Sequence, residues 1–124
     1  MRPSDREIWK KIADALEALR AGRWQPGIAK HFTDDMADLQ LDSTLDLAAL
    51  LIQFLEEIKR AGPVACYKGT RPPQKSYEPE IGNLELWAYA WHSDRFGRRM
   101  YLKFALKNQC YINVRCHEDR PQEN

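Results

Sequence analysis

Apolar residues recur with helical spacing in the first half of the chain and alternate with polar residues in the second half. The first predicted helix covers residues 4–21: Ser4 stands three residues before Glu7, in the spacing of a capping box, and Gly22 follows the last turn. One face of this segment is apolar and contains Ile8, Ile12, Ala15, Leu16 and Leu19. The spacing therefore predicts an amphipathic helix that packs on a core.

Two further helices are expected before residue 63. Thr33, which is followed by two aspartates, is a candidate start for a short helix within residues 28–41. Asp42 or Ser43 then caps the strongest helix of the chain, which ends before Gly62. The wide apolar stripe of this last helix contains Leu45, Leu47, Leu50, Leu51, Phe54, Leu55 and Ile58.

After Pro63 the apolar period changes to that of strands. Residues 64–68 are a short apolar run, and residues 69–83 are a loop rich in proline and glycine. Strands are predicted over residues 84–92, 99–107 and 110–117. This order predicts an α+β fold, in which N-terminal helices pack on one face of a C-terminal antiparallel sheet of three to four strands. The other sheet face is expected to stay open to solvent or ligand.

A length of 124 residues predicts a single domain over 1–124. Its helical part is expected over about 4–62, its sheet part over about 63–119 and a tail over 120–124. The net charge of +1 hides an asymmetry, since residues 1–62 hold nine basic and eleven acidic residues and residues 63–124 hold ten and seven. Any contact with nucleic acid is therefore expected in the second half.

Several classes of protein have no support in the sequence. The N-terminus lacks the apolar core of a signal peptide, and no apolar run approaches the ~20 residues of a membrane span. The three cysteines form no C-x-x-C pair, which argues against a disulfide framework or a zinc site. Neither a phosphate-binding glycine loop nor metal-ligand spacing occurs. We therefore expect a cytoplasmic protein with three buried thiols, no metal, no cofactor and no membrane partner.

The register of the last two strands decides which polar residues meet. A two-residue loop at 108–109 would set Lys103 beside Val114, whereas a loop of three or five residues pairs 103 with 115 and 101 with 117. The second register keeps both apolar sides in the core and is the one expected. It groups four residues on the non-core face, namely Tyr101, Lys103, Arg115 and His117. The apolar side of the last strand is expected to hold Cys110, Ile112, Val114 and Cys116.

These four residue types suit cleavage of RNA without a metal ion. The reaction needs a base for the 2′-hydroxyl, an acid for the leaving oxygen and cations around the phosphorane. His117 suits the role of acid or base near neutral pH, Arg115 and Lys103 can hold the phosphate, and Tyr101 can donate a hydrogen bond or stack on a base. The alternative is a solvated sheet face without a function, because cross-strand pairing alone explains Tyr and Arg there.

A basic stretch without any acidic residue covers residues 95–107. Its members Arg95, Arg98, Arg99, Lys103 and Lys107 are predicted to follow a phosphate backbone, the alternative being charge that protects a sheet edge. Trp87, Tyr89 and Trp91 alternate along the preceding strand, where they form a base-stacking platform or, as the favoured alternative, part of the core. If these aromatic rings face the core, His92 joins the polar face.

Four short motifs follow one another in the second half. They are Cys66-Tyr67-Lys68-Gly69, Leu86-Trp87-Ala88, Met100-Tyr101-Leu102-Lys103 and the final strand that ends in Cys116-His117-Glu118. In this order they resemble the Phe-Tyr-Lys-Ser, central-Trp, Val-Tyr-Leu-Lys and Phe-Lys-Glu segments of the MqsR-type toxins, which are RelE-like mRNA interferases of bacterial toxin–antitoxin pairs. The resemblance covers about residues 36–119.

The resemblance implies catalytic roles for Lys68, Tyr101 and the residue at His117. The chain departs from the family at His117, where the family has a lysine, and at Ala88, where the family has a catalytic glutamine. The loop over residues 69–83 is longer than in the family, and the helix over residues 4–21 has no counterpart there.

Together, the resemblance and the expected polar group predict a metal-independent endoribonuclease toxin. Its catalytic residues would be Lys68, Tyr101, Arg115 and His117, and its partners would be mRNA and a cognate antitoxin protein. The alternative is a non-enzymatic phage or bacterial regulatory or inhibitor protein, which binds a protein or nucleic acid through its basic sheet face.

Overall fold

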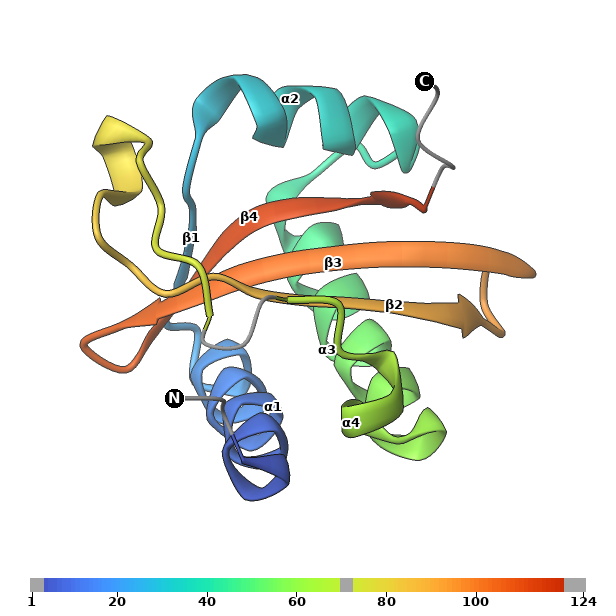
Figure 1. Cartoon of the computed structure of the whole chain (residues 1–124). Coiled ribbons are helices and arrows are strands. Elements are labelled where there is room, and N and C mark those ends of the chain that lie inside the picture. Colours follow the sequence, from blue (N-terminus) through green and yellow to red (C-terminus); the bar gives the residue numbers. More distant parts are fainter. Residues whose placement is uncertain (1–3, 70–72, 120–124) are drawn as a thin grey trace, which may run out of the picture.

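The computed structural model describes residues 4–69 and 73–119, which form three layers (Figure 1). The middle layer is a four-stranded sheet of β1 (Trp24–Pro26), β2 (Trp87–Ser93), β3 (Arg98–Lys107) and β4 (Cys110–Glu118), in the order β1-β4-β3-β2. Below it lie α1 (Asp5–Arg20), α3 (Thr44–Ala61) and α4 (Pro63–Cys66), and above it lies α2 (Ala29–Asp38). The 3-10 turn η1 covers Pro79–Ile81. The predicted α+β fold, with helices first and the sheet second, is confirmed.

The two long helices begin at the serines that the sequence indicates. The Ser4 hydroxyl accepts a hydrogen bond from the Glu7 amide at 3.2 Å, and the Ser43 hydroxyl accepts one from the Asp46 amide at 3.2 Å. Each hydroxyl satisfies an amide in the first turn that has no partner within the helix. Of the two candidate caps for α3, Ser43 is therefore the correct one.

The predicted start of α2 at Thr33 is wrong. The helix begins at Ala29, and the Thr33 hydroxyl donates to the Ala29 carbonyl at 3.1 Å from within the helix. Its N-cap residue, Ile28, offers no side-chain hydrogen bond. No side-chain cap sets the first residue of α2. The helix begins at Ala29 because the chain leaves the strand that precedes it just before that residue.

That strand, β1, was not predicted, and it carries the chain from one side of the sheet to the other. It pairs in parallel with β4 at the sheet edge, and the Gly27 amide extends the pairing by donating to the Asn113 carbonyl at 2.8 Å. A Cβ atom at Gly27 would lie 3.0 Å from the Ile112 methyl and 3.2 Å from the Asn113 carbonyl oxygen, so the close approach favours glycine. The next helix, α2, therefore covers part of the sheet face that we expected to be open (Figure 1).

The short apolar run over residues 64–68 does not form a strand. Its first part belongs to the single turn α4, and Tyr67 then makes an isolated antiparallel bridge to Tyr89 of β2. Pro63 stands at the first position of α4, where its missing amide hydrogen costs nothing. Tyr67 is thus the residue of this run that pairs with the sheet edge beside β2.

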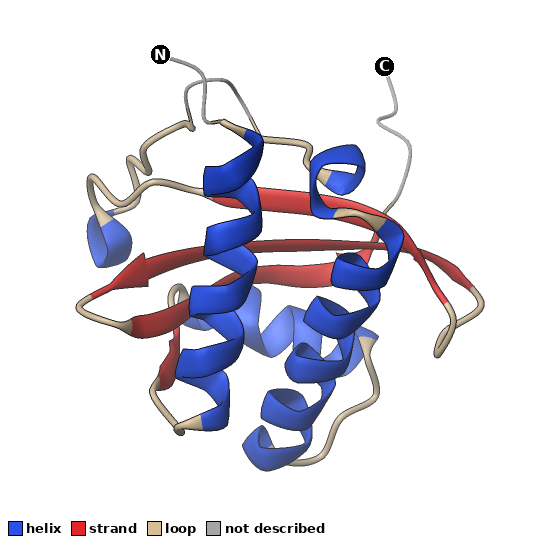
Figure 2. Cartoon of the chain, turned by 90° about the horizontal axis from the view of Figure 1, so that it is seen from below, coloured by secondary structure: helices blue, strands red, loops and turns tan. Residues whose placement is uncertain are grey.

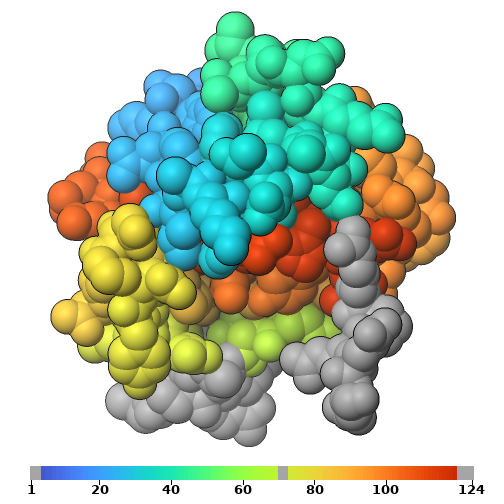
Figure 3. Space-filling view, turned by 90° about the horizontal axis from the view of Figure 1, so that it is seen from above, coloured from blue at the N-terminus to red at the C-terminus, as the bar shows by residue number. Residues whose placement is uncertain are grey.

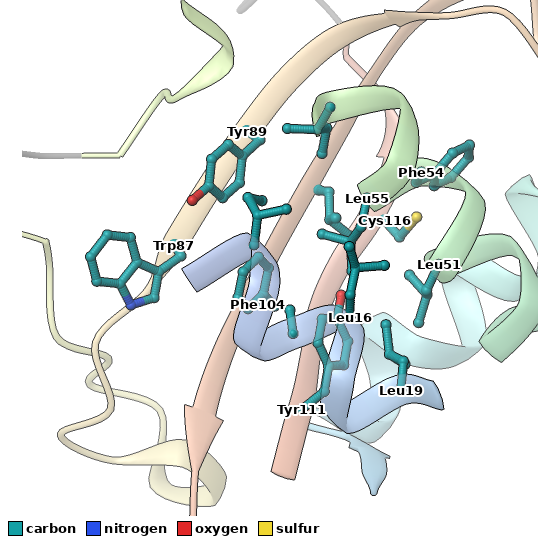
Figure 4. Packing of buried hydrophobic residues seen from close by; sticks show 14 of the residues in the cluster. Leu16, Leu19, Leu51, Phe54, Leu55, Trp87, Tyr89, Phe104, Tyr111 and Cys116 are labelled. Carbon is teal, nitrogen blue, oxygen red and sulfur yellow. The ribbon is translucent and has the colours of Figure 1, made fainter. Parts of the chain in front are cut away.

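The main core lies between the sheet and the lower helices. Figure 2 shows α1 and α3 side by side beneath the strands, and Figure 4 shows their leucines and Phe54 packed on aromatic rings of the sheet. Trp87, Tyr89 and Trp91 are all buried there, which confirms the core alternative for these rings. Cys66 and Cys116 are buried as expected, whereas Cys110 is half-buried, and all three are free thiols.

A second, smaller apolar cluster lies on the upper face. It consists of Ile81, Ala105, Ile112 and Val114, with Ile28, Leu84 and Leu86 packed around it. These residues come from β3, β4, the start of α2 and the loop after residue 73. The loop is therefore anchored on the sheet by apolar contacts.

Candidate functional site

The two long strands pair in the register that brings the polar residues together. Tyr101 pairs with His117, and Lys103 pairs with Arg115, as the alternation predicts. All four side chains are half-buried and lie on the sheet face opposite α1 and α3, which we call the polar face. We call Tyr101, Lys103, Arg115 and His117 the polar cluster.

A β-bulge sets this register, and the predicted loop of three or five residues is wrong. Asn108 and Gln109 form a two-residue turn with φ values of 51° and 64°, so Lys107 pairs with Cys110. The register then shifts between Lys103 and Phe104. An extra residue in one strand at this point moves the pairing by one position without lengthening the turn.

The bulge also breaks the alternation of β4, because Val114 is the extra residue. Tyr111, which strict alternation with Cys110 and Ile112 predicts on the polar face, lies in the main core with Cys116. Ile112 and Val114, which we expected in the main core, lie in the second cluster on the opposite face. The predicted sides of these three residues are therefore wrong. One extra residue in β4 reverses which sheet face each side chain points to, from Val114 back to the start of the strand.

The rings of Tyr101 and His117 stack on one another. Their centroids are 5.4 Å apart and their planes differ by 25°. His117 Nδ1 lies 2.6 Å from the Glu118 carbonyl oxygen. Because a carbonyl oxygen only accepts hydrogen bonds, the hydrogen of the neutral imidazole is assigned to Nδ1, which leaves Nε2 able to take up a proton.

Arg115 is held by an acidic residue of α2. Its Nε donates to Asp35 Oδ2 at 3.2 Å and its Nη2 to Asp35 Oδ1 at 2.9 Å, which is a bidentate pair. The Cys116 amide donates to the same carboxylate at 2.7 Å, and Asp35 is only 3 % exposed. The Arg115–Asp35 ion pair therefore links β4 to α2, and the Asp35 carboxylate largely neutralises the charge of Arg115.

Burial changes the acid–base properties of the other two members. It raises the pKa of the Tyr101 phenol, Asp119 raises it further and Arg115 opposes this. Burial also lowers the pKa of the Lys103 ammonium, as does the charge of Arg115, while Glu78 opposes this. Tyr101 therefore remains a phenol near neutral pH, and Lys103 releases its proton more readily than an exposed lysine.

Lys68 lies at the margin of this arrangement. Its amide donates to the Ala88 carbonyl at 2.8 Å, and Ala88 pairs with Lys103 on β3. Two strand spacings of about 4.8 Å each therefore separate the backbones of Lys68 and Lys103. Within the described residues, no hydrogen bond or ion pair joins Lys68 to the polar cluster, so the structure does not bring it together with Tyr101 and His117.

The predicted RNA-binding residues fall into two groups. Arg99, Lys103, Lys107 and His92 lie on the polar face, with Arg99 paired to His92 and bonded to Asp119 at 2.7 Å. Arg95 and Arg98 lie elsewhere. The Arg95 guanidinium donates to Gln53 of α3 at 2.6 Å, and Arg98 lies over the Phe96 ring and 3.6 Å from Glu118.

Figure 3 shows the polar face from above, with α2 in cyan and the loop after residue 73 in yellow on either side of the red and orange strands. Two hollows open here. One of about 250 Å³ is lined by Asp34, Asp35, Asp38, Arg115 and His117. The other, of about 240 Å³, lies between α2, residues 74–86 and the strands, and we call it the loop pocket. Lys103 and Arg115 line the loop pocket, so it adjoins the polar cluster.

Two residues of this site were missed from the sequence, namely Asp35 and His31. Asp35 falls on the apolar side of α2, three residues after Phe32 and four before Leu39. An acid in that position needs a buried partner, and this pattern could have indicated one. His31 lies in the first turn of α2 and lines the loop pocket, which no local pattern indicates.

No protein-family model, curated protein or solved structure matches the chain. Among residues 4–69 and 73–119, no three His, Cys, Asp or Glu side chains group so that they could hold a metal ion. Within the same ranges, no helix has the length and apolar character needed to cross a membrane.

Proposed function

We propose that this chain is a metal-independent endoribonuclease that cleaves single-stranded mRNA on its polar face, in the manner of the MqsR-type toxins that its second half resembles. The observation that carries the proposal is the stack of the Tyr101 and His117 rings, whose centroids are 5.4 Å apart. Lys103 lies beside this stack, in the next cross-strand pair on the same face of the sheet. A proton acceptor, a phenol and a partly buried ammonium thus lie within one patch of two strands.

The reaction forms a bond between the 2′-oxygen and phosphorus and breaks the bond to the 5′-oxygen. His117 Nε2 takes the proton of the 2′-hydroxyl, and Lys103 gives a proton to the departing 5′-oxygen. The phenol of Tyr101 donates a hydrogen bond to the phosphate, whose charge the Lys103 ammonium also stabilises before it gives up its proton. The products are a 2′,3′-cyclic phosphate and a 5′-hydroxyl.

The contacts of Arg115 and Lys68 give them different roles in this proposal. Arg115 is a positioning residue, because its guanidinium is already bonded to Asp35 and it holds α2 beside the cluster. Lys68 lies on the outer side of β2 and contributes to the positive margin that receives the RNA backbone. Arg99 and Lys107 extend this margin along β3.

The test is cleavage of a labelled single-stranded RNA in the presence of EDTA. We expect the wild type to cut it, and His117→Ala to lower the rate by about 10²–10⁴-fold, since a positioned acid or base supplies that much. Imidazole added to the His117→Ala protein should restore part of the lost rate. Lys103→Gln should also be slow, whereas the matched variant Lys59→Gln in the last turn of α3 should keep the wild-type rate.

Intact RNA in the wild-type reaction, together with unchanged growth when the protein is expressed, would overturn the proposal. A His117→Ala protein that cuts as fast as the wild type would also overturn it. We further propose that the protein acts in the cytoplasm and that a cognate antitoxin covers the polar face.

A second candidate is a non-enzymatic regulator that binds its partner through the same face. Two arginines of this face already form ion pairs within the chain, Arg115 with Asp35 and Arg99 with Asp119. This favours the second candidate, because paired guanidinium groups are less available to bind a reacting phosphate. For this candidate, His117→Ala leaves binding intact, whereas charge reversal at Arg99, which lies on this face, abolishes it.

A further inference from the structure

The loop pocket combines an apolar wall with polar groups at its rim. Ile81, Leu86 and Val114 line it on one side, and they belong to the loop after residue 73 and to β4. Its volume of about 240 Å³ is below the range of drug-sized sites, which begins near 300 Å³. An apolar cluster that lines a pocket of this volume suits one planar ring system.

The loop that forms this wall is held in place by backbone hydrogen bonds. The Ser76 amide donates to the Leu84 carbonyl at 2.9 Å, and the Leu86 amide donates to the Gln74 carbonyl at 2.8 Å. The Ser76 hydroxyl also accepts from the Glu78 amide at 3.1 Å. The wall is therefore formed before a ligand arrives, which reduces the entropy lost on binding.

Three polar or aromatic groups of the pocket lack a full set of partners among the described residues. His31 Nδ1 is buried without a hydrogen bond, and among the described residues no side chain or amide donates to the carboxylate of Glu78, whose own amide donates to the Ser76 hydroxyl. Tyr77 is 91 % exposed beside the opening, although large aromatic side chains usually lie against other groups. An aromatic rim next to an apolar wall is the arrangement on which unpaired bases stack.

We propose that the loop pocket binds a nucleobase that bears an exocyclic amino group, and that this base belongs to the nucleotide next to the phosphate held by the polar cluster. The placement beside that phosphate rests on the proposed function, and it follows from Lys103, which lines both sites. Glu78 selects the amino group because a carboxylate accepts hydrogen bonds and donates none. Uracil presents a carbonyl oxygen where cytosine presents its amino group, and the carboxylate repels that oxygen.

The test compares the binding of cytidine 3′-monophosphate and uridine 3′-monophosphate to the whole protein in EDTA, by titration calorimetry. These two probes differ only at the edge that Glu78 would contact. We expect the cytidine nucleotide to bind about tenfold more tightly, since one good base contact discriminates to this extent. In Glu78→Gln the advantage should fall below about twofold, because an amide can donate as well as accept.

Glu80→Gln is the matched control, since Glu80 is an exposed residue of the same loop that does not line the pocket. It should keep the full preference for the cytidine nucleotide. Equal affinities in the wild type, or a preference that survives Glu78→Gln, would overturn the inference.

RNA cleavage separates this inference from the proposed function. If RNA stays intact while the Glu78-dependent preference is present, the proposed function fails and the pocket assignment stands. If RNA is cut while the two nucleotides bind equally, the pocket assignment alone fails.

Discussion

Removal of the Asp35 carboxylate should weaken the attachment of α2 to the sheet more than any exposed change on that helix. Asp35 accepts three hydrogen bonds, two from the Arg115 guanidinium and one from the Cys116 amide. Asp35→Ala leaves a half-buried guanidinium and a buried amide hydrogen without their acceptor. Both groups then carry a desolvation cost that nothing offsets.

The size of the effect follows from how much water can replace the carboxylate. Breaking a buried ion pair by removing one partner costs about 3–5 kcal/mol. The Arg115 side chain is 28 % exposed and regains some hydration, so the lower end applies, about 3 kcal/mol. Since 1 kcal/mol shifts the Tm of a domain of this size by roughly 4 °C, the Tm should fall by roughly 12 °C.

The assay is urea unfolding followed by near-UV circular dichroism, for Asp35→Ala, Arg115→Met and the double variant. The interaction makes the double variant cost less than the sum of the single ones, by about 1–3 kcal/mol. Asp34→Ala is the matched control, because Asp34 is the exposed neighbour on the same helix, and it should change stability by less than about 0.5 kcal/mol.

Two results would refute this reasoning. One is an Asp35→Ala protein as stable as Asp34→Ala, which would show that the pair contributes nothing. The other is strict additivity of the Asp35 and Arg115 variants, which would show that the two side chains act independently.

Three further perturbations test other parts of the structure. Burial raises the pKa of Glu57, but hydrogen bonds from Trp91 and its neighbours outweigh this and leave it below the ordinary 4.5. The ionised Glu57 carboxylate therefore stabilises the fold above about pH 4.5, and this stabilisation is lost as the pH falls below that value. The urea midpoint should therefore decrease more steeply on acidification in the wild type than in Glu57→Gln. Parallel dependence on pH in the two proteins would contradict this. Gly97 has φ +64° and open space around it, so Gly97→Ala should lower the free energy of unfolding in urea by about 1 kcal/mol. Gly97→Asn should lower it less, because asparagine adopts this left-handed conformation more readily than alanine. An Asn variant less stable than the Ala variant would be inconsistent with this. Phe104 is fully buried between two tyrosine rings, so Phe104→Ala should cost about 3–5 kcal/mol in the same assay and Phe104→Leu clearly less, whereas equal losses would argue against ring packing.

Features that depend on neighbouring residues in the chain could be predicted from the sequence. The serine caps of α1 and α3 follow from local side-chain chemistry, and so does the burial of Trp87, Tyr89 and Trp91 along one side of β2. The pairing of Tyr101 with His117 was also predicted, because only that register keeps the polar residues of both strands together.

The means by which that register arises could not be predicted. A two-residue turn and a bulge at Val114 give the same pairing as a longer loop, and they differ in where Tyr111 and Ile112 point. The choice depends on which ring fits beside Phe104 in the core, and this packing is absent from any local pattern.

The α+β order, the long amphipathic helices and the members of the polar cluster could all be predicted from the sequence, since they depend on periodicity and on residues close together in the chain. Three features come from the folded arrangement alone: β1 carries α2 across the sheet edge, Asp35 holds Arg115, and His31 and Lys103 line the same pocket. Each of these arrangements brings together residues more than 70 positions apart, and such long-range arrangements are chosen by packing and charge matching in three dimensions.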